Sequence, residues 1–262
     1  MYKSLVPVSP ERHGGKAWRG FSGYLYAAGE AVLPLCAAEL PRAAADMPVG
    51  FLRQNEIVSP VAICSLVPGR NFYIAPDGRW LGGYVPAILR AYPFALVAGD
   101  GDQRVVCIDE ESGLLLEAPD AEGADPFFDD QNQPAGKFAQ VVDFLTHLER
   151  DRQATARLCA LLDSHGLFAD WPLKVDAGQG TQDVTGILRI DEAALNQLAD
   201  TAFLELRKAG ALPFIYTHLL STQRLPVLSR LAQLQTQLQQ RQPSLADAFE
   251  MPIDDDLEFN FD

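Results

Sequence analysis

Three consecutive acidic residues, Asp109, Glu110 and Glu111, end an apolar run that has the composition of a buried β-strand. Successive residues of a strand point to opposite faces, so Asp109 and Glu111 are expected on one face and Glu110 on the other. Two carboxylates on one face can divide the roles of acid and base, or they can hold a divalent cation. The simpler interpretation is that the acids cap a turn at Ser112 and Gly113. We favour it because no histidine or lysine stands near them in the sequence.

Other catalytic patterns fit the sequence poorly. His147, Glu149 and His218 follow the order of ligands in a non-haem iron site, but positions i and i+2 lie about 200° apart around a helix. The glycine-rich segment 178–182 matches neither nucleotide-binding loop pattern, so we interpret it as a hairpin turn. The common serine and cysteine nucleophile motifs are missing as well. The sequence predicts no metal site and no cofactor, and it leaves an enzymatic role open.

An aromatic stretch at 78–94 contains residue types that often anchor protein interfaces. It interleaves Trp80 and Tyr84 with Arg79 and Arg90. Aromatic and arginine side chains carry much of the binding energy at such interfaces. The same residues also fill ordinary cores, and the core interpretation is the one we favour for this stretch.

A second candidate contact surface is the polar loop 126–134, which contains Phe127 and Phe128. No periodic pattern in this loop predicts that either ring is buried. We therefore expect both phenylalanines to be available to a peptide or protein partner.

The last twenty or so residues, 243–262, differ in composition from the rest of the chain. They contain seven acidic residues and no lysine or arginine, which accounts for half of the net charge of −14. This composition is typical of a disordered, solubilising tail. Leu257, Phe259 and Phe261 alternate at strand period, however, and such a segment can add a strand to the edge of a sheet in this protein or in a partner.

The overall composition excludes some classes of partner. The chain has 262 residues, 48% of them apolar, with 21 basic and 35 acidic side chains. That is enough apolar material for a substantial core. A net charge of −14 repels a phosphate backbone, so binding to nucleic acid or to an anionic membrane is not expected.

Hydropathy and cysteine usage both predict a cytoplasmic location. The most apolar segment, 24–40, is interrupted by Glu30 and Pro34 and fits neither a membrane span nor a signal peptide. The four cysteines are widely spaced among apolar neighbours, which suits buried free thiols in a reducing compartment. They are Cys36, Cys64, Cys107 and Cys159.

Periodicity and turn residues predict an α+β fold, with an antiparallel sheet region and short helices followed by a helical C-terminal part. A single domain is expected over 1–242, before the acidic tail. Its sheet-rich region, 1–120, has expected strands at 48–52, 60–67, 71–75, 93–98 and 104–109, helices at 36–47 and 85–92, and turns at 76–78 and 99–102. An irregular loop (119–135), a long helix (136–163), a hairpin (172–177 with 183–191) and helices at 191–210, 213–222 and 226–242 follow.

Several sequence blocks resemble the SapC family. These are DGRWLGGYVPAILRAYPFAL, CIDEESGLL, PFFDDQNQP, FLTHLERDRQAT and GALPFIYTHLLS, which occur in the same order as in that family. The resemblance begins at VPVSPERH near the start of the chain and continues to about residue 235. It therefore covers nearly all of the predicted folded region, and the acidic tail is its least secure part.

The resemblance implies a role near the cell envelope. The family is named from a gene associated with surface-layer proteins, occurs in proteobacteria, and is often encoded near outer-membrane receptors, halogenase-like proteins and cupin-like oxygenases. It supplies no agreed catalytic residues. The resulting hypothesis is a non-catalytic accessory protein that binds a peptide or protein partner, such as one of those oxygenases, a halogenase-like protein or a surface-layer protein. The alternative is an enzyme, or an enzyme subunit, that uses the acidic cluster with Arg79 or Arg90 on a small substrate.

Overall fold

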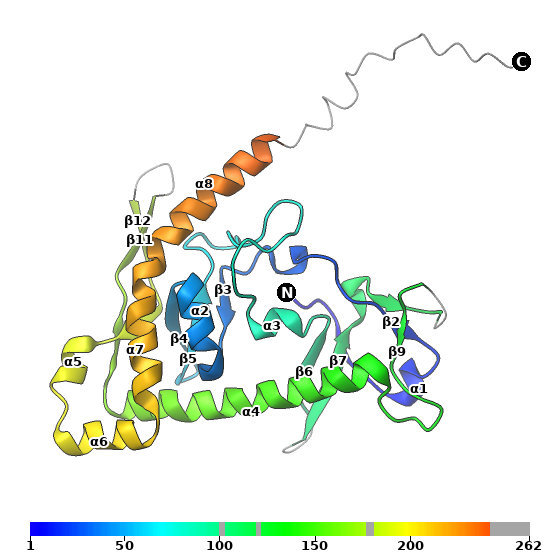
Figure 1. Cartoon of the computed structure of the whole chain (residues 1–262), viewed down its shortest axis with the longest axis horizontal. Coiled ribbons are helices and arrows are strands. Elements are labelled where there is room, and N and C mark those ends of the chain that lie inside the picture. The colour runs from blue at the N-terminus through cyan, green and yellow to red at the C-terminus, as the bar shows by residue number, and fades with distance from the viewer. Residues whose placement is uncertain (100–102, 119–121, 177–180, 242–262) are drawn as a thin grey trace, which may run out of the picture.

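The computed structural model describes residues 1–99, 103–118, 122–176 and 181–241. It is a mixed α+β fold of antiparallel sheets and helices, as predicted. The long helix α4 (Gly136–Ser164) runs along one side of the molecule, past two separate groups of strands (Figure 1). Each group of strands has its own hydrophobic core, and α4 contributes side chains to both.

The larger core lies under a five-stranded antiparallel sheet with the order β10-β13-β4-β5-β3. Helices α2 (Leu40–Asp46), α7 (Ala211–Ser221) and α8 (Leu225–Arg241) pack against it together with the second half of α4. Phe51, Ile63, Leu162 and Ile215 are fully buried there. The strands are β10 (Phe168–Asp170), β13 (Ile187–Ile190), β4 (Val49–Gln54), β5 (Ile57–Ile63) and β3 (Val32–Pro34).

The smaller core lies between the first half of α4 and two three-stranded sheets. Phe94, Phe127, Phe138 and Leu145 form much of it, and their aromatic rings contact one another edge to face or at a tilt. One sheet has the order β1 (Leu5–Pro7), β7 (Arg104–Asp109), β6 (Phe94–Ala98). The other has the order β8 (Leu115–Leu116), β2 (Ala17–Trp18), β9 (Asp125–Pro126).

Shorter helices and one further hairpin complete the fold. The α-helices are α1 (Pro10–His13), α3 (Ala87–Arg90), α5 (Glu192–Asn196) and α6 (Asp200–Lys208). The 3₁₀ helices are η1 (Leu25–Ala27), η2 (Ala37–Glu39), η3 (Glu110–Ser112) and η4 (Thr222–Arg224). A separate hairpin consists of β11 (Leu173–Asp176) and β12 (Thr181–Val184).

The expected long helix and most expected strands are confirmed, but some elements differ. The segment 71–75 is buried yet forms turns, because the Asn71 side chain accepts the N–H of Tyr73 at 3.0 Å and replaces a ladder bond. The expected strand 183–191 is divided at Gly186, whose φ of 85° suits glycine, and only its first part belongs to the hairpin. The expected helix 191–210 is likewise two helices, α5 and α6. The centres of the expected turns 99–102 and 178–182 lie outside the described residues.

The β4–β5 hairpin was not predicted as such, because its turn contains no glycine. Gln54 and Ile57 face each other in the register, so Asn55 and Glu56 form a two-residue turn with φ of 47° and 63°. Turns of this left-handed type match the twist of the strands that they connect. Asparagine tolerates that conformation well, whereas glutamate rarely adopts it.

His218 connects α7 to the sheet inside the larger core. Its ring is fully buried, its Nε2 accepts the N–H of Ile190 at 3.1 Å, and it lies against Phe51 and Trp171. Since Nε2 is an acceptor, the proton is on Nδ1, which has no hydrogen-bond partner among the described residues. Burial lowers the pKa of His218 to about 4, so this ring is neutral at physiological pH.

The low pKa of His218 predicts a loss of stability in acid. The unfolded chain binds a proton at a pKa of about 6.5 and the folded chain only near 4, so protonation favours unfolding as the pH falls through this interval. Between about pH 7.5 and about pH 5 we expect this residue to cost ~2 kcal/mol of unfolding free energy. Urea unfolding of wild type and His218→Gln measures it. The pH slope should be shallower in the variant, even though the variant is less stable at neutral pH.

The matched control is His147→Gln, which removes an exposed histidine on α4 and should keep the wild-type slope. Equal slopes in wild type and His218→Gln would contradict the assignment.

Candidate functional site

The three acidic residues at the end of β7 do not share a surface. The strand ends at Asp109, and Glu110 and Glu111 belong to η3, so the expected alternation along a strand is wrong from Glu110 onward. Asp109 is fully buried, Glu110 is partly buried and Glu111 is exposed. Their side chains therefore do not form the pair of carboxylates on one face that the sequence suggested.

Asp109 holds the N-terminal segment in place. Its two carboxylate oxygens accept the backbone N–H groups of Lys3, at 3.1 Å, and Ser4, at 2.9 Å. Those residues lead directly into β1, whose Leu5 faces Asp109 in the register with β7. A buried carboxylate with two backbone donors is a stable structural contact, because its lost hydration is replaced by charge-assisted hydrogen bonds.

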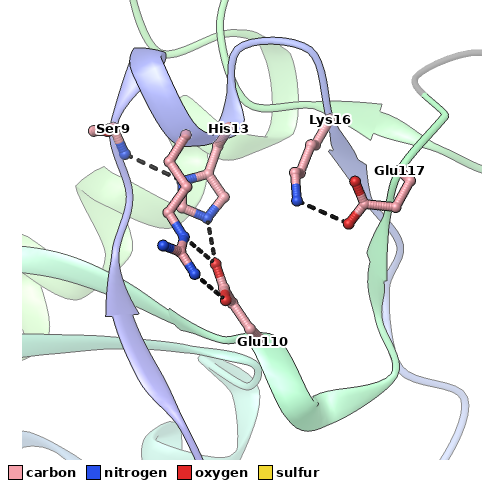
Figure 2. A network of polar contacts seen from close by, with 6 residues as sticks. Ser9, His13, Lys16, Glu110 and Glu117 are labelled. Atoms are coloured by element: carbon pink, nitrogen blue, oxygen red, sulfur yellow. Dashed lines mark hydrogen bonds and ion pairs between the residues drawn. The ribbon is translucent and has the colours of Figure 1, made fainter.

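Glu110 forms a second contact with the N-terminal region. Figure 2 shows its carboxylate facing one side of the His13 ring, while Ser9 lies at the other side. Arg12 donates two hydrogen bonds of 2.7 Å to Glu110, and the Nε2 atom of His13 lies 3.2 Å from Glu110 Oε1. The hydrogen bonds from Arg12 and His13 hold the pKa of Glu110 below its usual range. Arg12 makes the larger contribution.

His13 is unsuited to be a general base. Its side chain is fully buried, and its Nδ1 accepts the N–H of Ser9 at 3.3 Å, which places the ring proton on Nε2, toward Glu110. Burial lowers the pKa of His13, and the nearby Glu110 carboxylate opposes this shift without reversing it. Both ring nitrogens are thus already bonded to the protein. His13 stands in a short polar segment of the sequence with no apolar periodicity, so no local pattern predicts its burial.

Most of the expected aromatic contact residues are engaged within the chain. The Trp80 indole N–H donates to the Tyr84 carbonyl at 2.8 Å, and the Tyr84 hydroxyl donates to the buried carboxylate of Glu39 at 2.8 Å. Burial, with this bond to Glu39, raises the pKa of Tyr84. Arg79 is exposed and pairs with Asp77, and Arg90 lies 5.3 Å from the centre of the Phe144 ring.

The expectation that Phe127 is exposed was wrong. Its ring is fully buried in the smaller core, against Phe94 and Phe138, and Phe128 is partly buried beside it. The loop is held by backbone bonds, including one of 2.9 Å from the Ala135 N–H to the Phe127 carbonyl, and these turn the ring inward. A loop has no periodicity that could have revealed this burial. Leu257, Phe259 and Phe261 lie outside the described residues.

A groove along the middle of α4 is a better candidate site, and we call it the α4 groove. It has a volume of about 700 Å³ and lies between α4, β3 and the β4–β5 hairpin. Its apolar lining comes from the sheet and includes Val32, Ile57 and Val61. The polar side is formed by Arg104 and by α4 itself, through Glu149 and Arg152.

The charged side chains that line the α4 groove are two arginines, Arg104 and Arg152, and two glutamates, Glu30 and Glu149. Arg104 and Arg152 both approach the Glu149 carboxylate, at 3.0 Å and 3.5 Å, so two guanidinium groups share one carboxylate. Both arginines remain substantially exposed, at 44% and 61% of their side-chain surface. Glu30 pairs with the amino group of Met1, so the two exposed guanidinium groups remain available to an anionic ligand.

A smaller hollow of about 230 Å³ adjoins the same residues. It shares Glu149 and Arg152 with the α4 groove and is lined mainly by apolar side chains, among them Tyr2, Leu96 and Leu145. None of the three acidic residues Asp109, Glu110 and Glu111 lines either space. In the sequence, the charged run at residues 149–152 interrupts the apolar periodicity of the long helix at this place.

Metal binding and membrane insertion find no support in the described part of the chain. Within those ranges, no group of three histidine, cysteine, aspartate or glutamate side chains is arranged to hold a metal ion. None of the helices there combines the length and the hydrophobicity that crossing a bilayer requires.

Comparison with known proteins gives one match. A family model described as SapC matches residues 8–228, which is well over half of the chain. No curated protein and no solved structure matches the sequence.

The contacts of Asp109 predict that it stabilises the fold. In Asp109→Asn, one of the two backbone N–H groups faces an amide NH₂ instead of an oxygen, and a buried donor without a partner costs about 1–3 kcal/mol. Urea unfolding at neutral pH measures the difference from wild type. Glu111→Gln is the matched control, because that side chain is exposed, and it should stay within about 0.5 kcal/mol of wild type. A loss for Asp109→Asn no larger than that of the control would show that the contact is not structural.

Proposed function

The chain belongs to the SapC family, and from this membership and the α4 groove we propose that it is a non-catalytic accessory protein that binds a peptide or protein partner. The observation that carries the proposal is an open, amphipathic groove beside an unpaired stretch of strand. The groove binds an extended segment of the partner through an apolar side chain and a neighbouring carboxylate.

The strand edge supports an extended ligand. β3 pairs with β5 only at residues 61–63, while β5 itself begins at Ile57. Among the described residues, the outer edge of β5 from Ile57 to Ser59 therefore has no strand beside it. Both Ile57 and Ser59 line the groove, and 60% of the Ile57 surface is exposed. Addition of a strand to such an edge is a common mode of peptide recognition.

The charge of the groove supports an acidic ligand. Arg104 and Arg152 can each bind a carboxylate through two parallel hydrogen bonds, a geometry that lysine cannot provide. Glu149 already lies between them and orients both guanidinium groups. Val32 and Val61 line the same groove and offer an apolar surface to another side chain of the partner.

The biological setting that we propose is surface-layer or envelope-linked metabolism, with the protein acting from the cytoplasm. Candidate partners are the halogenase-like and cupin-like oxygenases encoded near members of this family, or a surface-layer protein. A reducing compartment suits the chain because Cys36, Cys64, Cys107 and Cys159 are all buried and free.

An enzymatic function based on Asp109, Glu110 and Glu111 has less support. Asp109 and Glu110 bind the N-terminal segment of their own chain, and Glu111 is exposed apart from them. A catalytic pair of carboxylates needs both groups to face one substrate pocket. A small ligand in the α4 groove is the remaining alternative, because its volume lies in the range of ordinary ligand sites.

The proposal predicts a specific peptide preference. A display library of short random peptides, selected on the full chain, should be enriched in peptides with Asp or Glu beside an apolar residue. In fluorescence anisotropy with a labelled synthetic copy of an enriched peptide, Arg152→Glu should weaken binding by about tenfold or more, equivalent to roughly 1.4 kcal/mol. Ile57→Ser should weaken it as well, since it removes the apolar contact.

Arg150→Glu is the matched control, because Arg150 is exposed on the same helix and does not line the groove. It should leave the peptide affinity close to that of wild type. Equal weakening by Arg150→Glu and Arg152→Glu would mean that net charge, and not the groove, determines binding. Failure to enrich any peptide would overturn the proposal in favour of a small ligand.

A further inference from the structure

The two C-terminal helices carry an exposed apolar surface that no described segment covers. α7 and α8 follow one another as a long arm, and α8 extends beyond the sheet region (Figure 1). Leu220 is 73% exposed, Tyr216 is 49% exposed and Leu234 is 39% exposed. Exposed apolar residues that gather on one helical arm usually mark a surface that another segment occupies.

The same arm carries positive charge without any negative charge. Between Glu205 and Asp247 the sequence has no acidic residue. Arg224 and Arg230 lie in this stretch, both are exposed, and neither forms an ion pair with the described residues. Spacings of four place Tyr216, Leu220 and Arg224 in one exposed row at α7, and Arg230 and Leu234 in a second exposed row on α8. We call these two rows together the α7–α8 face.

The segment that follows α8 has the complementary composition. Residues 243–262 lie outside the described ranges and are attached to the end of α8. They contain seven acidic residues, no basic residue, and the apolar side chains Leu257, Phe259 and Phe261 among others. Acidic groups match Arg224 and Arg230, and the apolar groups match the exposed Tyr216, Leu220 and Leu234.

Length and attachment favour an intramolecular contact. A segment of this length spans ~66 Å when extended, whereas α7 and α8 together measure ~46 Å, so it can reach the whole arm. Because the segment is attached at the end of α8, its effective concentration at the arm is on the order of millimolar. Two separate copies, each with a net charge of −14, repel one another.

We propose that the acidic C-terminal segment 243–262 folds back onto the α7–α8 face of its own chain. This goes beyond the proposed function of the α4 groove and does not depend on it. A partner that binds Leu257, Phe259 and Phe261 would have to displace the segment first.

The test measures how fast a thiol at the α7–α8 face reacts. The full chain with Leu220→Cys is treated with a neutral maleimide, and burial keeps the native thiols slow, since it raises the pKa of Cys36 and Cys159 to about 12. The reference is the same Leu220→Cys chain with Asp254→Asn, Asp255→Asn and Asp256→Asn in the tail. The chain with the wild-type tail should react at least about fivefold more slowly than this reference. A fivefold difference corresponds to a contact formed in about four fifths of the molecules. Replacing Leu257, Phe259 and Phe261 by serine should also release the thiol.

Two controls make the result specific. Neutralising the exposed residues Glu111, Glu122 and Asp130 changes the net charge equally and should leave the Leu220→Cys rate unchanged. A thiol at Ile57→Cys, in the α4 groove, should react at one rate whatever the sequence of the tail.

Three outcomes would overturn the proposal. Equal Leu220→Cys rates with the wild-type and altered tails would show that the segment does not cover the α7–α8 face. Protection of Ile57→Cys in place of Leu220→Cys would locate the segment at the α4 groove. Protection that rises with protein concentration would show that the segment binds a second copy.

Discussion

The arrangement of this molecule depends on one constraint, which is that a single helix serves two hydrophobic cores. α4 has 29 residues, a length of ~43 Å, and it buries Phe138 and Leu145 in the smaller core and Cys159 and Leu162 in the larger one. Between them the helix buries Leu148 in a small cluster with Cys36 and Ala87 that belongs to neither core. The charged residues Glu149 and Arg152 follow it, and the α4 groove and the smaller hollow meet at them. The α4 groove is thus a consequence of how two cores share one helix.

Charged groups in the smaller half of the molecule have a different task. Asp109 and Glu110 lie at the end of β7 and bind the chain before and after β1, by way of backbone N–H groups and the Arg12 and His13 side chains. These contacts connect residues about one hundred positions apart. They hold the first residues of the chain against the sheet that contains β7. Asp109 and Glu110 resemble part of a catalytic site in the sequence. In the structure they bind the segments on either side of the terminal strand β1.

The elements that depend on local sequence patterns were predicted correctly. The burial of side chains that depends on distant residues was not predicted. The long helix and the paired strands at 93–98 and 104–109 follow from periodicity and turn residues, and both are present. The burial of Phe127 depends on Phe94 and Phe138, which no local pattern connects to it. For the same reason the groove could not be predicted, since its lining comes from four separate stretches of chain. Only the interruption of helical periodicity at residues 149–152 gave a local indication of it.

The order of strands in the larger sheet has a consequence for synthesis on the ribosome. β4 lies between β5 and β13, so the sheet is incomplete until Ile190 has left the exit tunnel, and its core also requires Leu228 and Leu231 from α8. The smaller core, by contrast, has all its buried members by Leu145. The smaller core can therefore form early during synthesis. The apolar β4–β5 hairpin stays without β13 and α8 until those elements have been synthesised. During that interval the hairpin is the part of the chain most in need of a chaperone.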